Sequence, residues 1–311
     1  MSGRVAAIDC GTNAIRLLIA EVGSDGTLVE TVRLMRIVRL GEGIDRTGEF
    51  SPAALGRTFT ALDEYAGVLR DEAVTRVRFV ATSAGRDATN RDAFAAGVTA
   101  RIGVEPEVIT GVEEAELSFA GAVRGLPAGL VAPPALVVDI GGGSTEFVLG
   151  TSRPLHSASV DVGCVRMTER HLTGDPPTPE QVAAAWADID AGVARAGEAV
   201  PFAEARCLVG LAGSVTTVAA MAMDLPEYDA DILHGSVISA EAVADVTARL
   251  IAMPRAERAA LPFMHPGRVD VIAGGAMVLD SAMRAAAAHS VIVSETDILD
   301  GIVYRLAADS P

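Results

Sequence analysis

A short glycine-containing segment occurs twice in this chain, and the repetition constrains the fold more than any other feature. Residues 7–20 and residues 137–150 superpose after a shift of 130 positions, which places Asp9 on Asp139 and aligns the apolar runs on either side. Each copy has the pattern of a strand, an acidic turn and a second strand, which is typical of a β-hairpin. The repeat therefore predicts two similar half-domains.

The glycine turns of the two copies also predict a phosphate site. Glycine has no side chain, so backbone N–H groups beside it can turn inward around an anion. Two ordinary tight hairpins are the alternative, but polar residues gather only at the two turns. We expect the turns to face each other across a phosphate. The phosphate-binding residues predicted from the turns are Asp9, Gly11, Thr12 and Asn13 in the first copy, and Gly141, Gly142, Gly143, Ser144 and Thr145 in the second.

The second strands of the copies differ at one aligned position, where Arg16 meets Glu146. An arginine can hold a phosphate through its planar fork. A carboxylate at the equivalent place, paired with Asp139, suits a hard divalent metal. We therefore predict a two-sided grip on one phosphate, direct at Arg16 and through a metal at Asp139 and Glu146.

The composition limits the function classes that remain. The formal net charge is −16, which argues against general nucleic-acid binding. All 25 basic residues are arginine, so no phosphate-loop lysine exists and an anionic substrate must be held by arginine. No apolar stretch approaches the length of a membrane helix. Three widely spaced cysteines predict a reducing compartment, and we expect a cytoplasmic protein.

Strand-like and helical patterns alternate along the chain, which predicts an α/β protein. Helices are expected to begin at Ser51-Pro52 and at the Thr178 capping box, and a terminal helix is expected near 297–307. Prolines and glycines in 125–134 mark a connector. We predict one domain from residues 1–125 with the segment 297–311, and a second domain from residues 126–296.

Further candidate residues follow predicted strands. Thr110 and Glu113 have the spacing of a helix N-cap and its reciprocal glutamate, which explains Glu113 without a function. Glu114 is not explained in this way. It is a candidate for activating a water molecule, and the alternative is a solvated acidic residue at the start of a helix. The remaining phosphate-binding candidates lie in or beside turns that end apolar runs, and solvated turns are the alternative for them. They are Thr82, Ser83, Arg86, Arg166, Gly213, Ser214 and Arg268.

Two features resemble other sites but are predicted to be incidental. Cys10 and Arg16, and likewise Cys164 and Arg170, have the spacing of cysteine-dependent phosphatases. The first segment continues as a strand and the second lacks glycine, so neither forms their phosphate cradle. For His234, which precedes a glycine, we expect a packing role.

Taken in order, six segments resemble the exopolyphosphatase/guanosine pentaphosphate phosphohydrolase family of the acetate kinase, sugar kinase, heat-shock ATPase and actin superfamily. The Asp139–Glu146 loop with Glu113-Glu114-Ala115 upstream is the most specific part. The segments are 8–13, 81–84, 110–115, 139–146, 163–169 and 210–214.

The resemblance implies two actin-like (ribonuclease H-like) α/β domains with a cleft between them, in the short form without C-terminal helical domains. It implies hydrolysis of terminal phosphoanhydride bonds of inorganic polyphosphate, with Glu114 as the catalytic base. Asp139 and Glu146 would hold Mg²⁺ or Mn²⁺, and Arg86 and Arg166 would lie near the substrate. A homodimer is the expected assembly, with no membrane partner.

Three positions depart from the family pattern, and three alternative functions stay open. The departures are Gly85, Glu116 and the Asp300-Gly301 pair, which concern chain-length preference and contacts to the phosphate tail. The alternatives are a guanosine pentaphosphate (pppGpp) phosphohydrolase, an ATP-dependent kinase or chaperone-like ATPase (ATP or ADP as substrate or effector), and a non-catalytic sensor of polyphosphate or nucleotides. The joint presence of Glu114, Asp139 and Glu146 disfavours the sensor.

Overall fold

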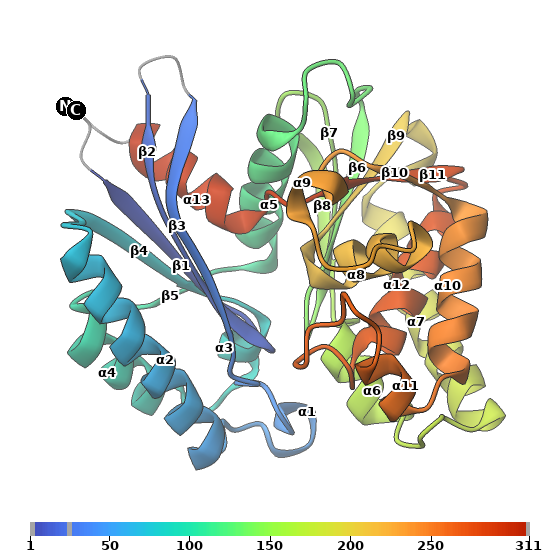
Figure 1. Cartoon of the computed structure of the whole chain (residues 1–311), viewed down its shortest axis with the longest axis horizontal. Coiled ribbons are helices and arrows are strands. Elements are labelled where there is room, and N and C mark those ends of the chain that lie inside the picture. Colours follow the sequence, from blue (N-terminus) through green and yellow to red (C-terminus); the bar gives the residue numbers. More distant parts are fainter. Residues whose placement is uncertain (1–3, 24–26, 309–311) are drawn as a thin grey trace. The chain divides into compact units, whose positions relative to one another are not determined.

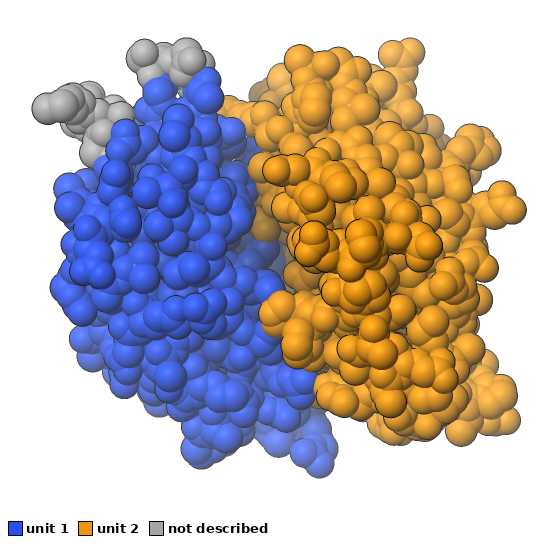
Figure 2. Space-filling model, viewed as in Figure 1, with its two compact units in different colours: residues 1–121, 298–311 blue, residues 122–297 orange. Residues whose placement is uncertain are grey.

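A computed structural model describes residues 4–23 and 27–308 of the chain. The chain divides into two compact units, residues 1–121 with 298–311 and residues 122–297, which Figure 2 colours separately. None of the helices in the described ranges is long and apolar enough to span a bilayer.

The first unit is built on a five-stranded mixed sheet with the order β3-β2-β1-β4-β5 (Figure 1). β1 pairs antiparallel with β2 and parallel with β4, and β4 pairs parallel with β5. The carboxyl ends of β1, β4 and β5 therefore meet at one edge, where ligands of α/β proteins bind. The strands are β1 Val5–Cys10, β2 Ala14–Val22, β3 Leu28–Ile37, β4 Arg76–Ala81 and β5 Glu107–Val108.

Helices cover both faces of this sheet because β1 is apolar on both sides. Ala6 and Ile8 pack with the core beneath α2 and α4, whereas Val5 and Ala7 pack with α5 and α13. This alternation follows from the two-residue period of a strand. The helices are α1 Ile44–Thr47, α2 Pro52–Asp71, α3 Ser83–Asp87, α4 Arg91–Ile102, α5 Gly111–Gly125 and α13 Ile298–Ala308.

The second unit has a six-stranded sheet with the order β10-β11-β9-β6-β7-β8. One large apolar core joins Leu136, Val138 and Ile140 of β6 to α7, α8, α10 and α12. The strands are β6 Ala135–Ile140, β7 Thr145–Gly150, β8 Pro154–Val160, β9 Cys207–Leu211, β10 Val237–Ser239 and β11 Ser290–Ser294. The helices are α6 Cys164–His171, α7 Pro179–Ala199, η1 Phe202–Glu204, α8 Ala212–Ala222, α9 Ala230–Leu233, α10 Ala240–Ala252, α11 Arg255–Ala259 and α12 Ile272–Ala285.

Five strands of each sheet share one topology, as the sequence repeat predicts, and β10 adds an antiparallel edge strand to the second sheet. In each, three antiparallel strands in hairpin order (β1-β2-β3 and β6-β7-β8) are followed by parallel strands beside the first of them. The registers also agree: Asp9 lies opposite Arg16, and Asp139 lies opposite Glu146. The prediction of paired hairpins is confirmed to the residue.

The expected helix starts are confirmed as well. Ser51 accepts a hydrogen bond from Ala54 N–H at the start of α2, and Thr178 and Gln181 form a complete capping box at the start of α7. One expectation is wrong in detail: the segment after β4, expected as a turn, forms the short helix α3.

Candidate active site

The first glycine turn is held by the chain that follows β3. Gly41 N–H donates to Thr12 O at 2.9 Å, and a Cβ at Gly41 would lie only 2.4 Å from Thr12 Cγ2. Asn13 O accepts hydrogen bonds from the N–H groups of Val38 and Arg39. The Thr12 hydroxyl is buried and has no hydrogen-bond partner within residues 4–23 and 27–308. Because a buried polar group is normally satisfied, this hydroxyl indicates a ligand position.

Arg16 is held in place from the neighbouring strand. Its Nε and Nη2 donate to Asp9 Oδ2 at 3.0 and 2.6 Å, and Asp9 is almost fully buried. An ionised carboxylate only accepts hydrogen bonds. We therefore expect Asp9 to serve the phosphate site by fixing the guanidinium of Arg16, rather than by contacting a phosphate itself.

Glu114 lies in the first turn of α5, which follows β5, and it is 8% exposed. Its Oε2 accepts a hydrogen bond from Arg86 Nη1 at 2.7 Å, and the same nitrogen donates to Ile109 O at 3.1 Å. Thr82 and Ser83 join this group because β4 ends beside β1: Thr82 N–H donates to Cys10 O. The structure thus brings Thr82, Ser83, Arg86 and Glu114 to the edge that carries the first glycine turn.

The expected capping box at α5 is only half formed. Thr110 Oγ1 accepts a hydrogen bond from Glu113 N–H at 3.2 Å, but the Glu113 carboxylate lies 2.7 Å from Arg78 Nη2 and 3.6 Å from Arg305 Nη1. The reciprocal bond predicted for Glu113 is therefore wrong. The reason is that two arginines compete for the carboxylate. Burial alone would lower the pKa of Arg78, but its hydrogen bonds to Glu107 and Glu113 raise that pKa above the usual value.

The second glycine turn lies against the start of α6. Gly141 O accepts from Cys164 N–H, Gly142 O accepts from the next two N–H groups, and Gly143 O accepts from Arg166 Nε at 2.8 Å. Within a planar trans peptide, C=O and the following N–H point in opposite directions. The N–H groups of residues 142–144 therefore point away from α6, as an anion-binding nest requires.

Gly163, the first residue of the 163–169 segment, makes this packing possible. A Cβ at Gly163 would lie 2.4 Å from Gly142 O, so only glycine lets the strand-to-helix connection approach the turn. Arg166, predicted near the substrate, is buried against the turn. The Thr145 hydroxyl donates to Val162 O, which ties β7 to the same connection.

Two acidic residues lie on neighbouring strands beside this turn. Asp139 and Glu146 lie directly opposite on β6 and β7, and they are 7% and 1% exposed. Oε1 of Glu146 accepts hydrogen bonds from Ser144 Oγ at 2.8 Å and Ser159 Oγ at 2.7 Å. No cluster of three or more His, Cys, Asp or Glu side chains suited to a metal occurs in the described part of the chain. Two carboxylates that leave positions for water and phosphate oxygens are a donor set that fits Mg²⁺.

Gly213, Ser214 and Arg268 come together at the start of α8. A Cβ at Gly213 would lie 2.3 Å from the Arg268 guanidinium, which also donates to Thr217 Oγ1 at 3.1 Å. An arginine at a helix N-terminus is on the electrostatically unfavourable end of the helix. Its position there suits a protein that places an anion at the same end.

Tyr228 and Glu295 add polar groups that the sequence analysis missed. The Tyr228 ring lies 5.9 Å from Arg268 Cζ, and its hydroxyl hydrogen-bonds to Glu295 Oε1 and to Thr216 Oγ1. Burial and the Glu295 carboxylate raise the pKa of Tyr228 to about 12. No sequence pattern marks Tyr228, because its partners lie on α8 and after β11.

The two cysteine–arginine spacings are incidental, as expected. Cys10 is fully buried in β1, and burial together with the Asp9 carboxylate raises the pKa of its thiol well above the usual value. Cys164 lies in α6, and burial raises its thiol pKa too. A phosphatase nucleophile needs the thiolate, so both environments are wrong for that chemistry.

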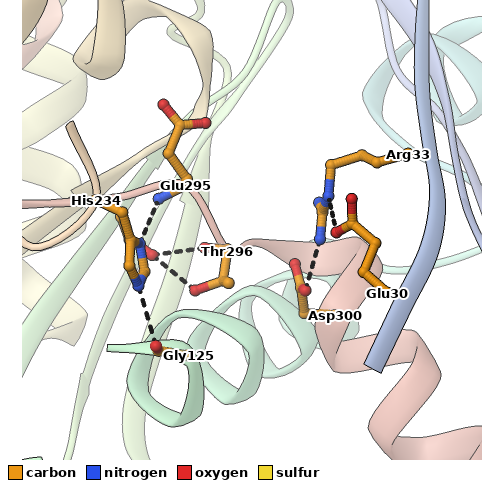
Figure 3. Close-up of polar contacts among 8 residues, drawn as sticks. Glu30, Arg33, Gly125, His234, Glu295, Thr296 and Asp300 are labelled. Atoms are coloured by element: carbon orange, nitrogen blue, oxygen red, sulfur yellow. Dashed lines mark hydrogen bonds and ion pairs between the residues drawn. The ribbon is translucent and has the colours of Figure 1, made fainter. Parts of the chain in front are cut away.

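The packing role expected of His234 is confirmed. Its Nδ1 accepts a hydrogen bond from Glu295 N–H at 3.1 Å, so Nε2 carries the proton and donates to Gly125 O at 3.0 Å (Figure 3). Gly125 is also tightly packed, since a Cβ there would lie 2.1 Å from Thr296 Oγ1. The histidine therefore joins the end of α5 to the segment after β11.

The Asp300-Gly301 pair, one of the three departures, is explained by packing within the first unit. Asp300 is buried on α13, and its Oδ1 accepts from Arg33 Nη2 at 2.7 Å, while Arg33 Nε donates to Glu30 (Figure 3). A Cβ at Gly301 would lie 2.0 Å from Leu117 O, so glycine lets α13 approach α5. These contacts anchor α13.

Comparison with known proteins decides the family. The model of the Ppx/GppA phosphatase family matches residues 18–309. The chain belongs to the Ppx/GppA phosphatase family. It is 51% identical to "Exopolyphosphatase 2" of Mycobacterium tuberculosis, and the alignment covers 98% of each chain.

Solved structures of the family share the fold. An exopolyphosphatase-like protein superposes with a TM-score of 0.94 at 43% identity, covering 98% of both chains. An exopolyphosphatase from Cytophaga hutchinsonii superposes with a TM-score of 0.90 at 25% identity, covering 99% of both. The predicted fold class of two actin-like α/β domains is confirmed.

Proposed function

We propose that this chain is an exopolyphosphatase, which hydrolyses the terminal phosphoanhydride bond of inorganic polyphosphate and releases orthophosphate. The observation that carries the proposal is a buried carboxylate, Glu114, held by Arg86 at the edge where the first glycine turn follows β1. Membership of a phosphatase family and a half-identical relative named exopolyphosphatase support the choice of reaction and substrate.

In the proposed reaction a water molecule attacks the terminal phosphorus, and the bond from that phosphorus to the bridging oxygen breaks. Glu114 accepts the proton of the attacking water, and the bridging oxygen remains on the shortened chain. Backbone N–H groups of the first glycine turn, the Thr12 hydroxyl and the Arg16 guanidinium stabilise the charge on the transferred group.

The proposal includes a divalent cation, Mg²⁺ or Mn²⁺, at Asp139 and Glu146. These two carboxylates lie on neighbouring strands, and Glu146 is oriented by the hydroxyls of Ser144 and Ser159. Carboxylate oxygens suit such a hard cation. When bound, it supplies charge neutralisation at the phosphoryl oxygens.

One assay separates the alternatives. Orthophosphate release is measured with polyphosphates of several lengths, with pppGpp and with ATP, at equal metal concentration. The proposal requires the highest kcat/KM for polyphosphate. A higher value for pppGpp would make the chain a pppGpp phosphohydrolase, and turnover of ATP alone would make it an ATPase or kinase. Binding of polyphosphate without release from any substrate would indicate a sensor.

A further inference from the structure

One oxygen of the Glu146 carboxylate accepts hydrogen bonds from two hydroxyl groups, which come from different parts of the second unit. Ser144 reaches it from the glycine turn, two residues earlier in the chain. Ser159 reaches it from β8, where it lies directly opposite Glu146 in the antiparallel ladder with β7. Both donate to Oε1, at 2.8 and 2.7 Å.

Two hydroxyls on one oxygen fix the rotation of the carboxylate group. A glutamate side chain has several rotatable bonds, and ordering it has an entropic cost on binding. A carboxylate that is already ordered by neighbouring hydrogen bonds avoids that cost when a cation arrives. Both hydrogen bonds go to Oε1, so they also determine the orientation in which the carboxylate meets a ligand.

The Ser159 hydroxyl bonds to the Glu146 carboxylate and takes no part in the apolar core of the second unit. Ser159 is exposed, so its side chain contributes little to the core. β7 and β8 are already paired along their backbones from Thr145↔Val160 to Gly150↔Pro154. Ser157 lies two residues away on the same face of β8, opposite Val148. The strand pairing at Ser157 therefore forms without a hydrogen bond to Glu146.

We propose that Ser159 is a positioning residue, which orients the Glu146 carboxylate for a divalent cation. The inference rests on the proposed function, because it takes Glu146 as a metal ligand. It assigns a role to a strand that lies outside every predicted motif.

The test is Mn²⁺ binding to the full chain without substrate, measured by the loss of the free Mn²⁺ signal in electron paramagnetic resonance. Ser159→Ala is expected to bind Mn²⁺ about 10-fold more weakly, as is typical for the loss of a group that orients a metal ligand. Ser159→Thr restores the hydroxyl and is expected to bind as the unmodified protein does. Ser157→Ala is the matched control and is also expected to bind normally.

Activity provides a second measurement. For Ser159→Ala, the Mn²⁺ concentration giving half-maximal phosphate release should rise by the same factor, with kcat unchanged at saturating Mn²⁺. The metal-free unfolding temperature of Ser159→Ala should be slightly lower than that of the Ser157→Ala control, because the buried Glu146 carboxylate keeps the Ser144 hydrogen bond but loses the one from Ser159, and Ser159→Thr should restore it. Unchanged Mn²⁺ affinity in Ser159→Ala, or no restoration by Ser159→Thr, would overturn the proposal.

Glu146→Gln distinguishes this failure from a failure of the proposed metal site. If Glu146→Gln loses Mn²⁺ binding while Ser159→Ala keeps it, the metal site stands and the positioning role is wrong. If Glu146→Gln binds Mn²⁺ normally, the metal site and the positioning role both fail. Absence of polyphosphate hydrolysis with normal metal binding would refute the exopolyphosphatase assignment alone.

Discussion

Replacing Glu114 by glutamine is the most direct test of the proposed chemistry, because the amide has almost the shape of the carboxylate. Arg86 has a second acceptor, Ile109 O at 3.1 Å, so its guanidinium is held in place when the charge on residue 114 is removed. The amide oxygen can still accept from Arg86. The variant therefore loses the base and little of the geometry.

The expected loss in turnover is about 10²–10⁴-fold, the usual effect of removing a general base. It corresponds to about 2.7–5.4 kcal/mol of transition-state stabilisation at 1.36 kcal/mol per factor of ten. The free energy of unfolding should fall much less, by about 1 kcal/mol, because a hydrogen bond between Arg86 and a charged group becomes one to a neutral group. Catalysis and stability are thus expected to separate clearly.

The neighbouring glutamate gives a matched control. Glu113 bonds to Arg78 and lies near Arg305, and both its carboxylate and that of Glu114 are in the first turn of α5. Glu113→Gln weakens a partly exposed ion pair, so we expect a stability change within about 1 kcal/mol and unchanged turnover. The comparison holds residue type, helix and substitution constant.

The assay is initial-rate phosphate release from saturating polyphosphate, with substrate affinity from equilibrium dialysis and stability from urea unfolding. Glu114→Gln should bind polyphosphate with near-normal affinity and turn it over very slowly. Wild-type kcat in this variant would refute Glu114 as the base. An equal loss of kcat in Glu113→Gln would show that the effect comes from disturbing α5.

Three further predictions use other parts of the site. Cys10→Ser should keep wild-type phosphate release, because the buried thiol has a raised pKa and is no nucleophile; an inactive variant would revive the cysteine-phosphatase reading. EDTA should abolish release and added Mg²⁺ or Mn²⁺ should restore it, with Asp139→Asn and Glu146→Gln each raising the metal concentration required; full activity in excess EDTA would contradict the metal site. Arg16→Ala should lower kcat for polyphosphates of every length, whereas Arg268→Ala should raise KM more for long chains than for short ones; a purely length-dependent defect in Arg16→Ala would contradict its assignment to the terminal phosphate.

The sequence predicted the fold well because the strongest signal was local and repeated. A hairpin brings residues a few positions apart into register, so the alignment of Asp9 with Asp139 was sufficient to predict that Arg16 and Glu146 occupy equivalent places. No element was predicted for residues 28–37 and 91–102, which form β3 and α4, and the five residues of α3 lack a periodic pattern.

The partners of the site residues could not be predicted, because most of them are distant in sequence. Arg86 and Glu114 are 28 residues apart and meet only because β4 and β5 are neighbours. Ser159 and Gly41 come from strands or loops next to the hairpins, and a single serine or glycine carries no pattern of its own. At Glu113 the local motif was recognised, but the predicted bond of its carboxylate to the cap does not form, because the carboxylate pairs with Arg78 instead.

The two hairpins have the same backbone but opposite electrostatics at their equivalent cross-strand pairs. In the first, Asp9 and Arg16 compensate each other's charge, so the pair is stabilised within the protein. In the second, Asp139 and Glu146 are like-charged residue types directly opposite each other and buried, an arrangement that a bound cation would stabilise. A cation that binds only the folded chain stabilises it by about 2.7 kcal/mol at 100 times its dissociation constant. The duplicated fold thus supplies two equivalent cross-strand pairs: one is a compensated ion pair, and the other is the pair of carboxylates for which we propose a divalent cation.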